Sequence, residues 1–377
     1  MFLALILSIT LVATVIACGG QPEQKEFRIG LIAPITGDIP TTGRAAVDGA
    51  TLAVKEVNDG GGLEIAGQAY QVVLVIEDNQ DKAEVSVQAA LKLVNQQNVI
   101  AIVGPYASRN AIPTAIVAER TKIPMISPAS TNPATTLNKT WVFRATFIDP
   151  FQGQVMARFA WEELNAQKVA VLYDIASEYN RGLAEFFRSS YEGYGGEMVA
   201  FESYTTDAPD VTQQMARIKE SGADVLFLPN YYNEVLQQVG QAREMGIKAQ
   251  IIGGDTWSSI QGADRSAVEG SYFSTHYAVD VADEKAKGFV TRFWEAYGRD
   301  PEDNAALTFD SFGLLFKAAK DQGKVDPDAI RDGLRAIVYR GVTGIIEYGT
   351  GSGDPLKSAV IMEIKDGNFV FHSRAEP

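Results

Sequence analysis

The sequence is poor in the residues that most often build reactive sites. It holds one cysteine, Cys18, and two histidines, His276 and His372. A single cysteine excludes an intrachain disulfide. Neither histidine lies near a serine or carboxylate signature, and the chain contains no Gly-x-Ser-x-Gly, His-Glu-x-x-His or Walker A pattern. We therefore predict that the protein is not an enzyme and has no cofactor and no metal site.

Positive charge and long apolar runs are also scarce. The chain has 33 Lys and Arg against 47 Asp and Glu, a net charge of −14. Nucleic acid and anionic membrane surfaces are bound by basic patches, so we predict no nucleic-acid partner and no such membrane contact for the body of the chain. A small ligand without net charge suffers little from this field, because local hydrogen bonds decide its capture. After Cys18, no apolar run approaches the length of a membrane span, so this body is expected to be soluble.

The first seventeen residues are almost wholly apolar, carry no charge and end in a small residue, Ala17, directly before Cys18. This pattern is similar to a bacterial lipoprotein signal peptide. We predict that residues 1–17 are removed, that Cys18 carries the lipid, and that residues 18–26 form a polar tether. The first basic residue is Lys25, whereas a signal peptide ordinarily opens with one. A cleaved signal without lipid and an apolar anchor helix are the alternatives.

The remaining chain, about 350 residues long, suits two domains of ordinary size. Strand-like and helix-like segments alternate along it. Arg28–Ile32, for example, precedes a stretch with apolar residues spaced three and four apart, as on one face of a helix. A second series of the same kind begins after Pro150. This rhythm predicts parallel strands joined by helical crossovers, with ligands at the carboxyl ends of the strands.

The C-terminal third adds further helical segments and two β-like ones, Thr343–Tyr348 and Ser358–Ile364. We expect the chain to return to the first lobe near His276 and to cross again near Pro355, because residues before proline favour extended conformations. The predicted boundaries are 27–148 with 277–356 for lobe 1, and 149–276 with 357–377 for lobe 2.

The segment Ser127–Pro133 has the composition of a ligand-binding loop. It follows the apolar, strand-like run Lys122–Ile126 and places small hydroxyl residues between two prolines. Ala129 allows a ligand close to the main chain, and Ser130 and Thr131 can donate hydrogen bonds without a formal charge. The alternative is an ordinary loop between a strand and a helix.

Several motifs, in order along the chain, together resemble periplasmic type I solute-binding proteins, in the leucine/isoleucine/valine-binding branch that serves ABC importers. The resemblance implies an α/β fold of two lobes, each a mainly parallel sheet flanked by helices, joined by a hinge of three segments. The motifs that carry it are Ile29-Gly30-Leu31, Pro34-Ile35-Thr36-Gly37, Glu77-Asp78-Asn79-Gln80-Asp81, Val103-Gly104-Pro105 with Ser108, the segment 127–133, and Phe143-Arg144 before Gln152-Gly153.

The resemblance assigns the two ends of an amino-acid ligand to the two lobes. Its α-carboxylate is expected at Ser108, Ala129 and Thr131. Ser108 also precedes the helical stretch 111–119, whose free N–H groups and positive dipole end favour an anion. A simple helix N-cap is the alternative for Ser108. The ammonium group is expected at Asp255, where the family usually has a glutamate, and a turn or cap residue is the alternative there.

Aromatic residues are expected to shape the rest of the pocket. Tyr179 and Tyr231 match family positions that touch the ligand, and Tyr106, Tyr232 and Trp257 are neighbours for which core packing is an equal alternative. Thr42 stands where relatives commonly place an aromatic residue. Branched-chain specificity is therefore not carried over, only the contacts to the amino and carboxyl groups.

The resemblance implies a lipid-anchored, monomeric receptor in the periplasm or at the outer face of the cytoplasmic membrane. It would capture an amino acid, with branched-chain and other apolar ones among the candidates, between two closing lobes and deliver it to an ABC permease. The alternatives are a ligand sensor of the same fold that signals through a partner, and a binder of an amide, a urea-like compound or an aromatic carboxylate.

Overall fold

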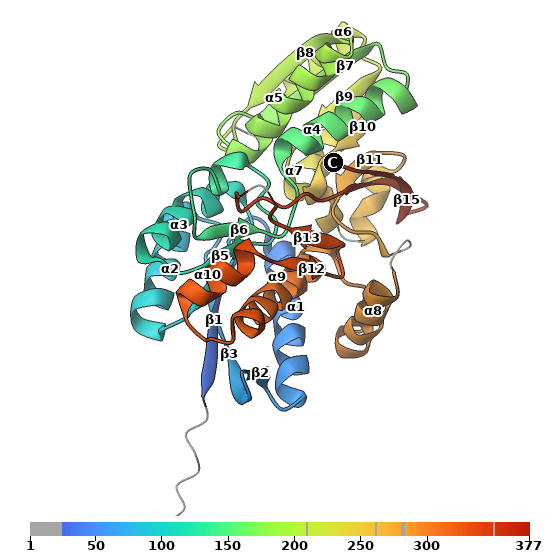
Figure 1. The fold of residues 1–377 in the computed structure, drawn as a ribbon. Helices are drawn as coiled ribbons and strands as arrows, with labels where there is room; N and C mark the ends of the chain where they lie inside the picture. Colours follow the sequence, from blue (N-terminus) through green and yellow to red (C-terminus); the bar gives the residue numbers. More distant parts are fainter. Residues whose placement is uncertain (1–24, 209, 261, 280–282, 350) are drawn as a thin grey trace, which may run out of the picture.

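Two bodies stacked end to end make up the molecule (Figure 1). The computed structural model describes residues 25–208, 210–260, 262–279, 283–349 and 351–377. Cys18 and the predicted signal peptide lie outside the described residues. We call the body around the first sheet lobe 1 and the body around the second sheet lobe 2.

Lobe 1 is built on a six-stranded sheet of the described residues, in the order β2-β3-β1-β4-β5-β6. Strand β1 runs parallel to both β3 and β4, and only β2 is antiparallel to its neighbour. Phe27, Ile29, Leu31 and Ile32 are fully buried, as expected for a central parallel strand covered on both faces. The strands are β1 (Glu26–Ala33), β2 (Leu63–Ile65), β3 (Gln68–Asp78), β4 (Ala101–Val103), β5 (Met125–Ser127) and β6 (Val142–Arg144).

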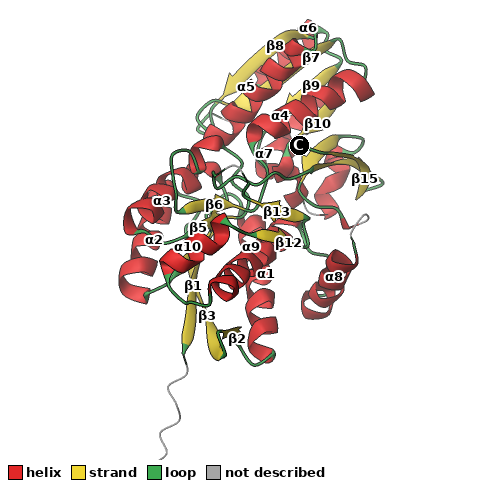
Figure 2. Ribbon diagram, in the orientation of Figure 1, coloured by secondary structure: helices red, strands yellow, loops and turns green. Residues whose placement is uncertain are grey.

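Helices cover both faces of this sheet (Figure 2). Helices α1 and α9 pack so closely at Gly49 that only a glycine fits there. A Cβ atom at this position would lie 2.3 Å from the backbone oxygen of Ala305. A short hairpin of β12 (Val338–Arg340) and β13 (Ile345–Glu347) lies outside the main sheet. The helices are α1 (Pro40–Asp59), α2 (Ala83–Gln97), α3 (Ser108–Thr121), the 3₁₀ turn η1 (Pro133–Thr135), α8 (Glu284–Tyr297), α9 (Asp303–Gln322) and α10 (Pro327–Arg335).

Lobe 2 holds a seven-stranded sheet of the described residues, in the order β15-β14-β11-β10-β9-β7-β8. Strands β7 to β11 are parallel, and β14 and β15 extend the sheet in antiparallel fashion. The strands are β7 (Lys168–Asp174), β8 (Glu197–Tyr204), β9 (Val225–Leu228), β10 (Gln250–Gly253), β11 (Tyr272–Thr275), β14 (Ala359–Lys365) and β15 (Asn368–Ala375).

Helices again flank this sheet, and the carboxyl ends of its central strands point toward lobe 1 (Figure 1). The helical elements are α4 (Asp149–Arg158), continued by the π turn η2 (Phe159–Glu163), then α5 (Glu178–Gly193), α6 (Thr212–Ser221), α7 (Tyr232–Glu244), η3 (Asp255–Ser259) and η4 (Gly262–Val268).

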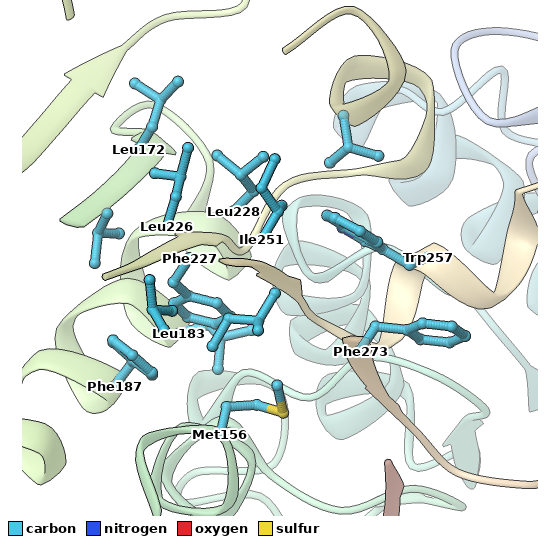
Figure 3. Close-up of a cluster of buried hydrophobic side chains, with 14 of the residues drawn as sticks. Met156, Leu172, Leu183, Phe187, Leu226, Phe227, Leu228, Ile251, Trp257 and Phe273 are labelled. Carbon is cyan, nitrogen blue, oxygen red and sulfur yellow. The ribbon is translucent and has the colours of Figure 1, made fainter. Parts of the chain in front are cut away.

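The core of lobe 2 gathers between the sheet and its helices (Figure 3). Phe187 of α5 stacks against Phe227 of β9, with ring centroids 4.3 Å apart. Trp257 is fully buried beside Phe273, at 6.4 Å between centroids, and thus belongs to this core. A Cβ atom at Gly253 would lie 2.1 Å from the Trp257 ring, so a glycine at the end of β10 is what admits the indole.

The chain passes between the two sheets after β6, after β11 and after β13. The predicted α/β fold with two mainly parallel sheets is therefore confirmed. Apart from Glu26, which opens β1 and was predicted to end the tether, strands of the first sheet fall within the residues predicted for lobe 1. Strands of the second sheet fall within those predicted for lobe 2, and the boundaries themselves stay a prediction. Helix α6 and strands β2, β6, β8, β11, β12 and β15 were not predicted. Among the described residues, no helix is both long and apolar enough to span a membrane.

Candidate ligand-binding site

A small cavity lies between the lobes. Its volume, counted over the positions open to the centre of a water-sized molecule, is about 30 Å³. Both lobes and the connecting segments supply its walls. Its lining residues are Ile39, Thr42, Tyr106, Ala107, Ser108, Ala129, Tyr179, Tyr231, Tyr232, Asp255, Thr256, Ser259, His276, Asp303 and Asn304.

The lobe 1 wall combines the start of α3 with the loop after β5. The Ser108 hydroxyl lies 2.9 Å from that of Ser130, which in turn lies 2.7 Å from that of Thr135. Ala129 lines the cavity next to them. The first N–H groups of α3 have no acceptor within the helix, and its dipole is positive at this end. This wall therefore suits a small anion such as a carboxylate.

Thr131 does not line the cavity. Its side chain is fully buried beside the Asp149 carboxyl. Burial raises the pKa of Asp149 to about 8, against the nearby Thr131 hydroxyl and together with the negative charge of Asp255. The predicted contact between Thr131 and a ligand stays a prediction.

Arg144 holds the loop that carries Ala129 and Thr131. Its guanidinium is fully buried and donates to the backbone carbonyls of Ser130 at 2.5 Å and Asn132 at 3.0 Å. It also pairs with Asp354 at 2.6 Å, on the third crossing of the chain. The loop is thus fixed by a residue of β6 and by the hinge. Such preorganisation lowers the entropy lost when a ligand binds.

Asp255 forms the charged part of the lobe 2 wall. It opens η3 at the carboxyl end of β10, and 5% of it is exposed. Oδ1 accepts hydrogen bonds from Tyr179 at 2.6 Å and Gln152 at 2.9 Å, and Oδ2 lies 3.2 Å from His276 Nε2. Burial alone would raise the pKa of Asp255, but the hydrogen bond and the charge of His276, with hydrogen bonds from Tyr179 and Gln152, hold it below its ordinary value. The carboxylate is therefore ionised at neutral pH.

One acceptor position of Asp255 remains for a ligand. A carboxylate can accept about four hydrogen bonds, and three are used here. When His276 carries its proton on Nε2, it donates to Asp255, while Nδ1 accepts from the Thr146 hydroxyl at 2.7 Å. The sequence analysis missed this site role of His276, although its position directly after β11 is where ligands of parallel sheets bind.

Aromatic rings close the cavity on the lobe 2 side. The rings of Tyr179 and Tyr231 lie 5.3 Å apart between centroids, and both line the cavity. Burial and the charge of Asp255 raise the pKa of the Tyr179 hydroxyl, so this group stays protonated and donates. The guanidinium of Arg109, on α3 of lobe 1, stacks over the Tyr231 ring at 4.5 Å and pairs with Asp81.

Further contacts join the lobes around the cavity. The backbone N–H of Thr41 donates to the Tyr232 hydroxyl at 3.2 Å, and the Asn132 amide donates to the backbone oxygen of Glu178 at 2.8 Å. The Thr42 and Ser259 hydroxyls lie 3.5 Å apart. Together with the stacking of Arg109, these contacts describe two lobes closed upon each other.

The structure brings together most of the predicted site residues. Ser108, Ala129, Asp255, Tyr179, Tyr231 and Tyr106 all line one cavity. The remaining two do not. Thr131 belongs to the loop 127–133 but does not line the cavity. Trp257 packs in the core described above, which was the alternative given for it, and a ligand contact of either residue stays a prediction.

Residues that the sequence analysis did not propose complete the lining. Asp303 and Asn304 open α9, and Ser259 ends η3. No local pattern marks them as site residues, since helix starts rich in Asp and Asn are common for capping alone. The assembled cavity has a carboxylate-binding wall in lobe 1 and an anionic group in lobe 2, so it can hold a small dipolar molecule.

Comparisons with known proteins agree with this geometry. A family model described as periplasmic binding protein matches residues 26–368. The chain is 26% identical over 352 residues to Leu/Ile/Val-binding protein homolog 1 of Brucella abortus, covering 93% of each chain.

Two solved structures also resemble it closely. A leucine binding protein from Thermotoga maritima has a TM-score of 0.86 and 32% identity, with 93% of this chain and 99% of that one covered. A branched-chain amino acid transporter substrate binding protein from Streptococcus pneumoniae, in complex with isoleucine, has a TM-score of 0.86 and 32% identity, with 94% and 100% covered. The resemblance stated from the sequence motifs is thus confirmed.

Proposed function

The chain belongs to the periplasmic binding protein family, and from this premise we propose that it captures an α-amino acid outside the cytoplasm and presents it to an ABC permease. The observation that carries the proposal is the single cavity that Ser108 and Asp255 line from opposite lobes. The first offers a hydroxyl at a helix start, and the second a buried carboxylate with an acceptor position to spare.

A zwitterion matches these two walls in charge and in hydrogen bonding. Its carboxylate would face the N-terminal end of α3 and the Ser108 hydroxyl, where the dipole favours an anion. Its ammonium would donate to Asp255, forming a charge-assisted hydrogen bond away from bulk water. Relatives whose names include leucine or isoleucine as ligands support an amino acid in this role.

Ligand binding and lobe closure are coupled in this proposal. Because the contacts to the carboxylate belong to lobe 1 and those to the ammonium to lobe 2, the ligand makes all of them only in the closed form. Its higher affinity for that form shifts the hinge equilibrium, and the permease recognises the closed outline. The ligand is released unchanged, since no step of the proposal alters it.

Anchoring through Cys18 places the receptor at the outer face of the cytoplasmic membrane. The apolar run before Cys18 supports this part of the proposal. Replacement of Cys18 by serine is expected to move the protein from the membrane fraction to the soluble fraction of a bacterial host that processes lipoproteins. Membrane retention of Cys18→Ser, measured by fractionation and blotting, would favour an uncleaved anchor instead.

The test of the binding function is calorimetry and thermal shift with all twenty amino acids, each paired with its deaminated carboxylic acid. A ligand that binds only the folded form raises the melting temperature. We expect at least one amino acid to bind and its deaminated analogue to bind far more weakly. Chromatography of the mixture after incubation should return the amino acid intact. Failure of every amino acid, or equal binding of the deaminated acids, would overturn the proposal.

A further inference from the structure

We infer that the amino acid bound in this cavity carries a hydrogen-bond donor in its side chain, such as a hydroxyl or an amide N–H. This inference rests on the proposed function and narrows it to a class of substrate. Its basis is a third wall of the cavity, distinct from the carboxylate wall and from Asp255. We call Thr42, Ser259, Asp303 and Asn304 the polar wall; all line the cavity and all are buried.

The polar wall is assembled from three separate elements. Thr42 lies in the first turn of α1, Ser259 at the end of η3, and Asp303 and Asn304 at the start of α9. The Asn304 amide donates to the Ser259 hydroxyl at 3.3 Å, and that hydroxyl lies 3.5 Å from Thr42 Oγ1. These contacts engage the amide nitrogen of Asn304 and leave its oxygen for another partner.

Two acceptors of the wall have no donor among the described residues. They are Asn304 Oδ1 and Asp303 Oδ1, and both atoms are buried. The other carboxylate oxygen of Asp303 accepts from the Thr275 hydroxyl at 2.9 Å. Buried acceptors in native proteins nearly always have a partner, so two of them on residues that line one cavity point to a ligand that supplies donors.

The nearby hydroxyls of Ser258 and Tyr106 are engaged elsewhere. Ser258 lies close to Asp303, but its proton goes to the backbone oxygen of Asp255 at 2.8 Å. The Tyr106 hydroxyl is 2.5 Å from that of Thr308, which itself donates to the backbone oxygen of Asn304 at 2.6 Å. The Tyr106 hydroxyl therefore donates its proton to the Thr308 hydroxyl oxygen and not to the polar wall.

The charge of the site agrees with this reading. Burial raises the pKa of Asp303, although the charge of His276 and hydrogen bonds to the carboxylate act to lower it. A donor from the ligand would stabilise its charged form, whereas an aliphatic side chain would exclude water and leave both acceptors unpaired. Leaving such groups dry and unpaired is the physical basis on which a polar site rejects an apolar analogue.

The experiment compares amino acids of equal shape on the full wild-type chain by calorimetry. Threonine is matched to valine, and asparagine to leucine. We expect threonine and asparagine to bind about tenfold to hundredfold more tightly than their apolar counterparts, the range set by one unpaired buried acceptor. Aspartate, similar to asparagine in shape but without a side-chain donor when ionised, should bind more weakly than asparagine.

A variant assigns the preference to the polar wall. Asn304→Leu replaces one unpaired acceptor by an apolar group of similar shape, and we expect the ratio of threonine to valine affinity to fall about tenfold. Asn95→Leu, the same change on an exposed position of α2 in lobe 1, is the matched control and should keep the wild-type ratio. A ratio of affinities cancels a general loss of stability.

The outcomes separate this inference from the function on which it rests. Valine or leucine binding as tightly as threonine or asparagine overturns the inference and leaves the amino-acid function intact. Failure of all amino acids to bind overturns both. The wild-type comparison is decisive by itself, so the inference stays falsifiable even if Asn304→Leu does not fold.

Discussion

Replacing Asp255 by asparagine removes one negative charge from the cavity and almost nothing else. The amide has the shape of the carboxylate, and its oxygen can still accept from Tyr179 and Gln152, which now stand at 2.6 and 2.9 Å. Its NH₂ group would face His276, whose Nε2 can become the acceptor while Nδ1 donates to Thr146. The exchange therefore keeps the network connected.

The expected loss falls on the ligand. An ammonium group buried opposite a neutral amide loses its charge partner, and losing one member of a buried charged pair costs about 2–5 kcal/mol. This corresponds to a dissociation constant roughly 30-fold to several thousandfold higher. The stability of the unliganded protein changes through two opposing effects. Three hydrogen bonds to a charged acceptor become neutral ones, at about 1 kcal/mol each, but repulsion between Asp255 and the nearby carboxylates of Asp149 and Asp303 disappears.

The measurement is isothermal calorimetry with the best amino-acid ligand and with its deaminated analogue. Asp255→Asn should weaken the first and leave the second unchanged or improved. Glu244→Gln is the matched control, because it removes an exposed carboxylate from the last turn of α7 in the same lobe. Its affinities should equal those of the wild type. Thermal denaturation without ligand shows that both variants fold.

One result would refute this reasoning. If Asp255→Asn bound the amino acid with wild-type affinity while folding normally, the ammonium group would have its partner elsewhere. The proposed orientation of the ligand across the two lobes would then be wrong, however well an amino acid bound.

Three further predictions concern the closed form, the core and the hinge. Arg109→Lys keeps the pairing with Asp81 but loses the stacking on Tyr231. Calorimetry should show ligand binding about twofold to thirtyfold weaker, since a cation–π contact is worth about 0.5–2 kcal/mol. Unchanged affinity would show that this contact does not favour closure of the lobes. Trp257→Phe should lower the free energy of unfolding by about 1–3 kcal/mol, because it leaves a cavity in the core. Ligand affinity should stay unchanged, and a loss of affinity without a loss of stability would show that the indole contacts the ligand. The pKa of Asp149 rises on folding from 3.8 to about 8, so between these pH values the folded form binds a proton that the unfolded form does not. The stabilisation from this proton is full below pH 4 and is lost as the pH rises to 8. Urea titrations should show this fall in the free energy of unfolding for the wild type and not for Asp149→Asn, and the same fall in both proteins would contradict the assignment.

Local patterns in the sequence were enough to predict the architecture. Alternating apolar runs and helical faces are visible within short windows, so β1, α3 and β14 were predicted near their observed bounds. The positions of Ser108 and Asp255 followed from the same logic, since each opens a helical turn after a parallel strand. What could be read locally was the kind of element and the residue at its end.

Contacts between distant parts of the chain could not be predicted in this way. Thr42 and Ser259 are 217 residues apart, and Ser259 and Asn304 are 45 apart, so no short pattern indicates that they share a wall. Their meeting depends on where the chain crosses between the lobes and on how closely α1 packs on α9 at Gly49.

The sequence by itself determined two α/β lobes, the strand ends that carry Ser108 and Asp255, and the acidic character of the protein. Only the tertiary structure decided which side chains share the cavity. Trp257 packs in the core, because Gly253 has no side chain and leaves space for the indole there. His276, Asp303 and Asn304 line the cavity. The physical reason is that backbone periodicity is a local property, whereas the direction of a side chain at the end of an element is fixed by packing against residues far along the chain.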